Sequence, residues 1–200
     1  MLISIEGPDF VGKNTIIEKI MEYNKETPIK IISFPNNDTE IGKICRQMLR
    51  DTKEWTKAQS AIFQLLNTAH RYEYYDQIKE AKYSKNEILF VIRYNLSGPV
   101  YASIDGLDAT KTWQLYDWFY DVLPDITFIL FRNYDFNHFK KIREAEHYET
   151  ESKQEKIQKI YSIAPILWRE KLGKSFIIQN KDIDQSVTNI FSIIKEQMDL

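Results

Sequence analysis

The sequence predicts an α/β protein in which an open parallel β-sheet carries helices on both faces. Three observations predict this fold class: five short apolar runs recur along the chain, helical patterns separate them, and no Pro-, Gly- or Ser-rich linker divides the 200 residues. Strands that alternate with helices form right-handed βαβ units, whose strands are parallel. The runs show little alternation, which suits strands buried on both faces; they are residues 2–5, 29–33, 88–92, 126–131 and 176–178.

Helices are expected between these strands, because apolar residues recur there at three- and four-residue spacing. The expected helices are 14–23, 39–50 with Thr39 as N-cap, 56–82 and 183–198. In the long helix 56–82, the stripe expected to face inward consists of Ile62, Leu65, Leu66 and Ala69. The chain is predicted to be a single domain, 1–200, in which the charged stretch 133–159 after the fourth strand forms a mobile helical lid.

Composition excludes several classes of protein. Hydrophobic residues make up 43% of the chain and charged residues 28%, which is typical of a globular protein and not of a disordered one. The net charge of −2 provides no basic field for nucleic acid. The single Cys45 cannot form an internal disulfide, which favours a reducing compartment. Because no secretory leader and no apolar run of roughly 20 residues is present, we expect a cytoplasmic protein that binds neither membranes nor nucleic acid.

The main functional signal is a glycine-rich loop directly after the first strand. The chain has only six glycines, yet Gly7 and Gly12 frame the segment GPDFVGKN, which fits G-x-x-x-x-G-K between a strand and a helix. Backbone N–H groups of such a loop bind phosphate oxygens, and Lys13 is placed to bridge the β- and γ-phosphates of a nucleotide. The residues expected to bind this nucleotide are Gly7, Pro8, Phe10, Val11, Gly12, Lys13, Asn14 and Thr15.

The residue after the lysine departs from this motif. A serine or threonine hydroxyl ordinarily helps to hold Mg²⁺ there, whereas this chain has Asn14 followed by Thr15. An amide oxygen can bind a hard cation, so Asn14 is the candidate metal ligand. The three histidines, at positions 70, 138 and 147, lack the spacing of a metal site.

Four blocks of sequence, in order, resemble the thymidylate kinase family. EGPDFVGKNT is similar to the family's E-G-x-D-x-x-G-K-x-T opening, and FPNNDTEIGK, LLNTAHRYE and RYNLSGPVY are similar to its next three blocks. The resemblance spans essentially the whole chain. It implies a P-loop NTPase-type three-layer αβα fold with a five-stranded parallel sheet and a helical lid. It also implies a homodimer and transfer of the γ-phosphoryl group of ATP, with Mg²⁺, to a deoxynucleoside monophosphate (dTMP to dTDP).

The resemblance further implies roles for individual residues. Asp9 is expected to contact the 3′-hydroxyl of the acceptor sugar, Lys13 the donor phosphates, and Arg93 the acceptor phosphate. Arg71 is expected to reach the pyrimidine base. The other residues expected to shape the acceptor pocket are Phe34, Asn37, Asn67, Ser97, Gly98, Tyr101 and Tyr148.

An arginine from the lid completes the implied site. In this family an arginine of either the phosphate-binding loop or the lid supports transfer. Phe10 fills the loop position here, so the lid must supply the arginine, and Arg143 is the candidate ahead of Arg132.

Three positions depart from the family pattern. Ile92 replaces the aspartate of an Asp-Arg pair, Asn37 replaces an arginine, and Asn67 replaces a phenylalanine that stacks on thymine. A register shift of one residue would instead leave Phe63 or His70 facing the base. The alternatives to dTMP phosphorylation are the same reaction on another or modified pyrimidine monophosphate, and a nucleotide-binding pseudokinase.

Overall fold

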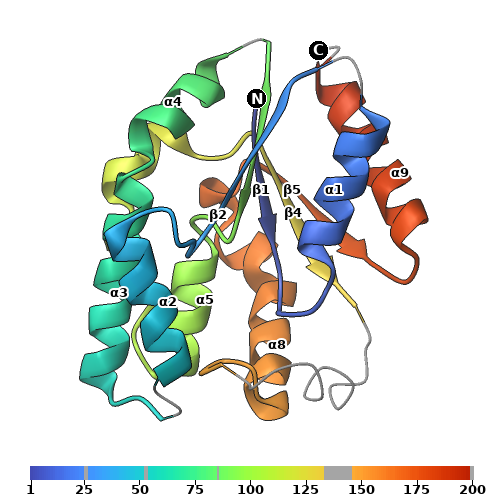
Figure 1. Ribbon diagram of the computed structural model, residues 1–200. Coiled ribbons are helices and arrows are strands. Elements are labelled where there is room, and N and C mark those ends of the chain that lie inside the picture. Colours follow the sequence, from blue (N-terminus) through green and yellow to red (C-terminus); the bar gives the residue numbers. More distant parts are fainter. Residues whose placement is uncertain (25–26, 52–53, 85, 133–145, 199–200) are drawn as a thin grey trace.

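The chain forms one parallel sheet with helices packed on both faces. The computed structural model describes residues 1–24, 27–51, 54–84, 86–132 and 146–198 (Figure 1). Its five-stranded sheet has the order β2-β3-β1-β4-β5, and every neighbouring pair is parallel. The strands are β1 (Leu2–Glu6), β2 (Ile29–Ser33), β3 (Ile88–Ile92), β4 (Ile126–Phe131) and β5 (Lys174–Gln179). The predicted α/β class and the parallel sheet are confirmed.

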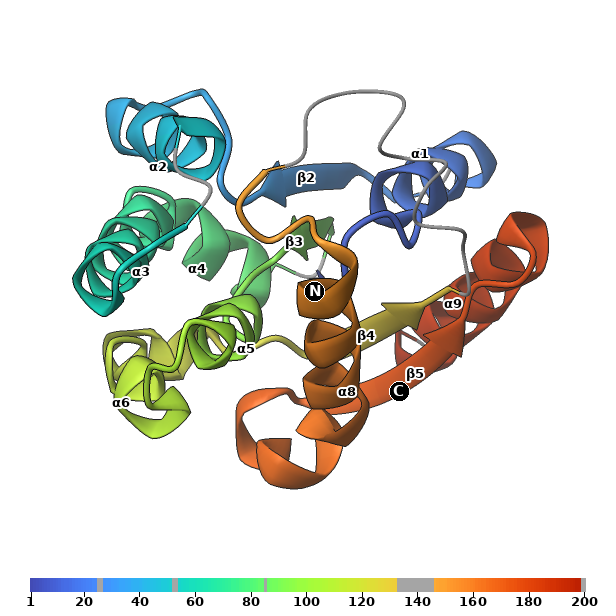
Figure 2. The ribbon, with the colours of Figure 1, turned by 90° about the horizontal axis from the view of Figure 1, so that it is seen from below.

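Two layers of helices enclose this sheet, as Figure 2 shows. On one face lie α1 (Lys13–Tyr23) and α9 (Ile183–Met198), which contact each other. The other face carries a larger group: α2 (Glu40–Asp51), α3 (Lys57–Tyr72), α4 (Tyr75–Tyr83), α5 (Ser97–Ile104), α6 (Ala109–Gln114), the 3₁₀ helix η1 (Asp117–Val122) and α8 (Glu151–Leu167). A second 3₁₀ helix, η2 (Arg169–Lys171), leads into β5.

The two faces of the sheet form two separate apolar cores, because successive side chains of a strand point to opposite faces. In β1, Leu2 packs with the larger helical layer, whereas Ile3 and Ile5 pack with α1 and α9. Burial on both faces holds for β1, β3 and β4. It does not hold for β2 and β5, where Ile31 is 39% exposed and Ile177 50% exposed, because these strands form the edges of the sheet.

The long helix expected over 56–82 is two helices, α3 and α4, with a break between Tyr72 and Tyr75. Thr56 caps α3 in a reciprocal capping box with Gln59. Thr39 caps α2 as expected, since its hydroxyl accepts a hydrogen bond from the backbone N–H of Gly42 (3.1 Å).

The expected inward face of α3 is wrong for two of its four residues, whereas Leu66 packs against the core as expected. Ile62 is 50% exposed and Leu65 55% exposed, whereas Asn67 and Arg71 are buried. Apolar spacing predicted the amphipathic helix but not its orientation, because its polar face lines a cavity that the sequence does not reveal. No helix in the described ranges combines the length and hydropathy that a membrane span needs.

Candidate active site

A cavity of about 720 Å³ lies beyond the C-terminal ends of β1, β2 and β3. This is where ligands bind in open α/β sheets. The predicted residues that line it are Asp9, Phe10, Gly12, Lys13, Asn14, Thr15, Phe34, Asn37, Asn67, Arg71, Arg93, Ser97, Gly98, Tyr101 and Tyr148. The structure therefore brings the predicted donor and acceptor residues to a single cavity.

The loop between β1 and α1 needs its glycines for backbone reasons. Gly7 has φ +131°, and a Cβ there would lie 2.3 Å from the carbonyl oxygen of Leu130. Gly12 has φ +89° and directly precedes the first turn of α1. Gly7, Pro8 and Val11 belong to this loop but are not among the residues that line the cavity.

Lys13 folds back onto its own loop. Its ammonium donates hydrogen bonds to the carbonyl oxygens of Gly7 (3.1 Å) and Pro8 (2.5 Å). Burial, and next the charge of Arg93, lower the pKa of Lys13 to about 7, against the opposing effect of Asp9. A negatively charged ligand would favour the protonated form of this lysine.

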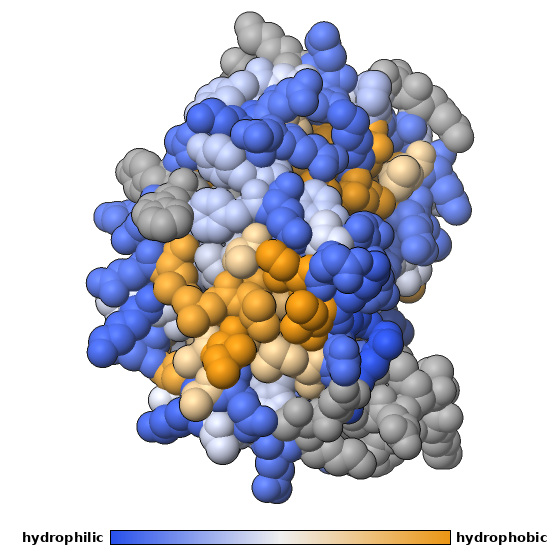
Figure 3. Space-filling model, turned by 60° about the vertical axis from the view of Figure 1, so that its left-hand side comes forward, coloured by the Kyte–Doolittle hydropathy of each residue, from blue (hydrophilic) through white to orange (hydrophobic). Residues whose placement is uncertain are grey.

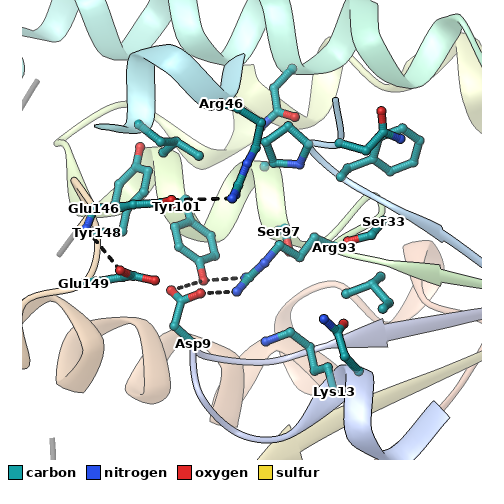
Figure 4. A pocket seen from close by; sticks show the side chains of 18 of the residues that line it. Asp9, Lys13, Ser33, Arg46, Arg93, Ser97, Tyr101, Glu146, Tyr148 and Glu149 are labelled. Carbon is teal, nitrogen blue, oxygen red and sulfur yellow. Dashed lines mark hydrogen bonds and ion pairs between the residues drawn. The ribbon is translucent and has the colours of Figure 1, made fainter. Parts of the chain in front are cut away.

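Asp9, Arg93 and Tyr101 form a connected polar group in the cavity (Figure 4). The guanidinium of Arg93 forms an ion pair with Asp9 and donates to the Tyr101 hydroxyl (2.6 Å), which donates to the other Asp9 oxygen (3.0 Å). Burial opposes ionisation of both charged groups, but their mutual attraction raises the pKa of Arg93 and lowers that of Asp9. Both groups therefore stay charged.

Gln154 of α8 holds Asp9 in place, a role that the sequence did not reveal. Its Nε2 donates to an Asp9 carboxylate oxygen (2.7 Å), and its Oε1 accepts from the Asp9 backbone N–H (2.9 Å). The two residues are 145 positions apart, and Gln154 belongs to no recognised motif.

Ser97 connects the cavity to a buried carboxylate below it. Its hydroxyl donates to Glu6 (2.6 Å), and Glu6 also accepts from Tyr161 (3.2 Å) and Ser4 (3.1 Å). Glu6 is fully buried. This network joins β1, α5 and α8 beneath the site.

Arg71 is bonded to backbone and side-chain oxygens inside the protein. It donates to the carbonyl oxygens of Tyr94 (2.9 Å) and Arg93 (2.6 Å), and to both oxygens of Asn67 (2.7 and 2.8 Å). Its guanidinium lies 5.1 Å from the centre of the Phe34 ring. Arg71 thereby fixes the positions of Asn67 and Arg93, and its contact with the base remains a prediction.

The segment before α8 is attached to α3 and α5 through Asp105. This carboxylate accepts hydrogen bonds from Ser60 (2.7 Å) and Tyr148 (2.7 Å) and lies 3.1 Å from Nε2 of His147. The ring of His147 stacks on Trp55 at 4.0 Å. Sequence reasoning missed Asp105, because nothing in its neighbourhood distinguishes it from a solvated helix-end aspartate.

Two further predictions concern the lid and the metal. Arg143 and the first part of the predicted lid, 133–145, lie outside the described residues, whereas Arg132 lines the cavity. Asn14 and Thr15 are exposed at its edge. Within the described residues, no group of three His, Cys, Asp or Glu side chains is arranged to hold a metal ion.

Comparisons with known proteins show the family. The family model for thymidylate kinase matches residues 5–190. The chain is 30% identical to the thymidylate kinase of Plasmodium falciparum over 161 residues, 80% of this chain and 74% of the relative. It is 26% identical to that of Finegoldia magna over 200 residues, 96% of this chain and 94% of the relative.

Solved structures agree with the fold. A thymidylate kinase from Candida albicans superposes with a TM-score of 0.73 at 25% identity, covering 98% of this chain and 91% of that one. The Ehrlichia chaffeensis enzyme has a TM-score of 0.70 at 21% identity, over 97% and 98% of the two chains, and shows the shared fold. The chain is thus a nucleoside monophosphate kinase and belongs to the thymidylate kinase family.

Proposed function

We propose that this chain transfers the γ-phosphoryl group of ATP to dTMP and releases dTDP and ADP. One observation carries the proposal: a single cavity joins the phosphate-binding loop and Lys13 to a second fixed cation, Arg93, and to a pocket on α3 and α5. Phosphoryl transfer depends mainly on positioning and charge neutralisation. A cavity with phosphate-binding groups at two points suits a reaction between two nucleotides.

The loop and Lys13 bind the donor. The first turn of α1 and the loop backbone supply N–H groups for phosphate oxygens. Lys13 exchanges its bonds to the Gly7 and Pro8 carbonyls for bonds to the β- and γ-phosphates. This exchange gives the buried ammonium a charged partner and places it where charge develops during transfer.

Arg93 positions the acceptor. An oxygen of the dTMP phosphate attacks the γ-phosphorus as the bond to the β–γ bridging oxygen breaks, and that oxygen leaves with ADP. Asp9 and Tyr101 hold the Arg93 guanidinium at the cavity, where it orients the attacking phosphate. Asp9 lines the cavity, where its carboxylate accepts a hydrogen bond from the 3′-hydroxyl of the sugar.

Mg²⁺ is part of this proposal. Asn14 and Thr15 offer neutral oxygen donors at the cavity, which fits an ion that takes most of its ligands from phosphates and water. Ile92 lines the cavity as well as packing in the core beside α1 and α9, but its aliphatic side chain supplies no carboxylate for the ion. When bound with ATP, Mg²⁺ neutralises charge on the transferred phosphates.

The predicted lid is proposed to exclude water, the competing acceptor of the phosphoryl group. Tyr148 lies over the acceptor pocket, where its ring packs edge-on against Tyr101 at 4.8 Å (Figure 4). Glu146 lies 3.5 Å from Arg46 and thereby ties the same segment to α2. Arg143 is the candidate for the arginine that reaches the transferred phosphate.

A homodimer in the cytoplasm completes the proposal. Exposed apolar side chains gather on one face of the molecule (Figure 3). Ile44 of α2 and Ile62 and Leu65 of α3 are exposed, and these two helices contact each other. Such a patch is typical of an interface between proteins, and the resemblance supplies a second copy of the chain as its partner. Cys45, a buried free thiol, suits a reducing compartment.

A coupled assay with ATP, Mg²⁺ and a panel of nucleoside monophosphates tests the function. We expect turnover of dTMP, and we expect Lys13→Met to reduce kcat by at least about 100-fold, because a preorganised charge at the transferred group is lost. The matched control is Lys19→Met on the outer side of α1, where Lys19 pairs with Asp184; it should keep activity.

Other results would contradict the proposal. ATP binding without turnover of any monophosphate would favour the pseudokinase, for which Ile92 in place of a carboxylate is the supporting observation. Full activity in Lys13→Met would contradict the assignment of the loop.

A further inference from the structure

Gln64 of α3 carries a buried side-chain amide without a hydrogen-bond partner. The residue is 2% exposed, and among the described residues neither its Nε2 nor its Oε1 has a partner. Gln64 lines the cavity. Leaving a buried amide unsatisfied costs stability, and such exceptions in folded proteins call for an explanation. A ligand with both a donor and an acceptor would satisfy this amide.

The hydroxyl groups next to Gln64 donate their protons to Asp105. The hydroxyl of Tyr148 lies close to Gln64, where its oxygen is a possible acceptor for Nε2, but it donates its proton to Asp105 at 2.7 Å and so has none to give to Oε1. Ser60, one turn before Gln64 on α3, also donates to Asp105 at 2.7 Å. No neighbouring hydroxyl therefore donates to Oε1 of Gln64, and at least one of the two Nε2 protons is left to the cavity.

Asn67 lies one turn further along the same face of α3, and its amide orientation is fixed. Its Oδ1 accepts from Nη1 of Arg71 at 2.8 Å. A flipped amide would set the NH₂ of Asn67 against a guanidinium that can only donate. The side-chain NH₂ is therefore the group left over, and no acceptor among the described residues takes its proton. Asn67 lines the cavity as well.

We propose that Gln64 and Asn67 read the acceptor base and select pyrimidines with a carbonyl group at C4. The Asn67 NH₂ donates to O4, Oε1 of Gln64 accepts from N3–H, and Nε2 of Gln64 donates to O2. This donor–acceptor–donor order complements thymine and uracil. Cytosine carries an amino group at C4, which would meet the Asn67 NH₂ donor to donor. The inference rests on the proposed function and refines its acceptor.

Base recognition by hydrogen bonds from Gln64 and Asn67 differs from base stacking. The family resemblance places a phenylalanine at position 67, whose ring discriminates weakly because every base has a π-face. A site that forms hydrogen bonds with its substrate rejects an analogue with mismatched groups far more strongly. Asn67 and Gln64 thus exchange stacking for hydrogen-bond selectivity.

The first test uses the full-length chain with ATP, Mg²⁺ and each of dTMP, dUMP and dCMP. We expect kcat/KM for dTMP and dUMP to exceed that for dCMP by at least about 100-fold. Gln64→Met keeps the length of the side chain without its polar atoms. It should raise KM for dTMP at least about tenfold, while the unfolding temperature does not fall, because an unpaired buried amide is removed.

The matched control is Gln77→Met, the same substitution at an exposed glutamine of α4. It should change neither KM nor the preference among the bases. If Gln64→Met fails to fold, or if it unfolds at a lower temperature while KM for dTMP is unchanged, Gln64 is structural. Either result overturns the role of Gln64 in reading the base.

Asn67→Asp is the second, independent variant. A carboxylate still accepts from Arg71 but presents an acceptor where the NH₂ was, so it suits the amino group of cytosine. We expect the ratio of kcat/KM for dTMP over dCMP to fall at least about tenfold. Because the ratio is taken within one variant, it is insensitive to a general loss of stability.

The outcomes separate this inference from the proposed function. If the wild-type chain phosphorylates none of the three monophosphates, the proposed function fails. If it phosphorylates dTMP but the base preference is unchanged in Asn67→Asp and KM is unchanged in Gln64→Met, only the base-reading role is overturned. Preference of the wild-type chain for dCMP would overturn it as well.

Discussion

Lys13 is a buried cation in the phosphate-binding loop. Its ammonium donates to the carbonyl oxygens of Gly7 and Pro8, and its pKa is lowered to about 7, chiefly by burial and next by Arg93. A lowered pKa means that the folded protein holds this proton less tightly than the unfolded chain does. The lysine therefore costs stability below its ordinary pKa of 10.5, and stability rises with pH between about 7 and 10.5.

Nucleotide binding should consequently take up a proton. At pH 8.5 Lys13 is mostly neutral in the free protein, and the donor phosphates restore its charge, so we expect uptake approaching about one proton for each ATP bound. Calorimetry in two buffers of different ionisation enthalpy measures this number. Lys13→Arg is the control, because arginine is charged before and after binding; uptake that persists in it would assign the proton to another group.

At the scale of secondary structure, α3 has two functional faces. The buried one carries Gln64, Asn67 and Arg71 toward the cavity, whereas the other exposes Ile62 and Leu65. Through Ser60 the helix also reaches Asp105 at the end of α5, and Asp105 in turn binds the segment before α8. Three elements on the site's border are thus connected by a single carboxylate.

Asp105→Asn should weaken this connection. An amide keeps one acceptor oxygen and sets an NH₂ against groups that donate to the carboxylate, so we expect a loss of about 1–3 kcal/mol in the free energy of unfolding at pH 7. Urea unfolding measures it, with Asp76→Asn, an exposed aspartate of α4, as control.

The pH dependence of this difference follows from the Asp105 pKa. Burial would raise it, but hydrogen bonds from His147, Tyr148 and Ser60 lower it below the ordinary 3.8. A lowered carboxylate pKa contributes stability that is fully present above pH 3.8 and is lost as the pH falls through the lowered pKa. The difference in free energy of unfolding between wild type and Asp105→Asn should therefore be the same at pH 7 and at pH 5. Equal stability of the two proteins at pH 7 would show that the carboxylate does not hold the elements together.

The molecule exposes an apolar face (Figure 3), and exposed apolar side chains lie on α2 and on α3, the helix whose other side lines the acceptor pocket. Burial of this face against a second copy would stabilise the dimer by about 25 cal/mol for each Å² of apolar surface removed from water. The second copy would also contact the exposed face of α3, while the buried face of α3 contacts the substrate. The proposed dimer therefore supports the geometry of the acceptor pocket.

Leu65→Glu should dissociate the dimer. Sedimentation velocity of the wild-type chain should give twice the 23.8 kDa of one chain, and the variant should give the monomer mass, because a buried unpaired carboxylate is costly. Ile166→Glu is the matched control, since Ile166 is 82% exposed and lies on α8, not on α2 or α3. A monomeric wild type, or a dimer that survives Leu65→Glu, would place the interface elsewhere.

The sequence was sufficient for the fold class, the parallel strands, the glycine loop around Lys13 and the four family blocks. These features depend on local periodicity and on residues close together in the chain, where spacing alone carries the information. Position in the sheet was not predictable in this way, because whether β2 and β5 are edges depends on the order of strands that are distant in sequence.

The orientation of α3, the support of Asp9 by Gln154 and the convergence on Asp105 came from packing alone. Periodicity identifies an apolar stripe but not the surface that will cover it, so Ile62 and Leu65 were expected inside. Gln154 meets Asp9 across 145 residues, and the energy of such a contact exists only once both helical layers are assembled. The local chemistry of this site could therefore be derived from residue order, whereas the partners of its polar groups required the three-dimensional fold.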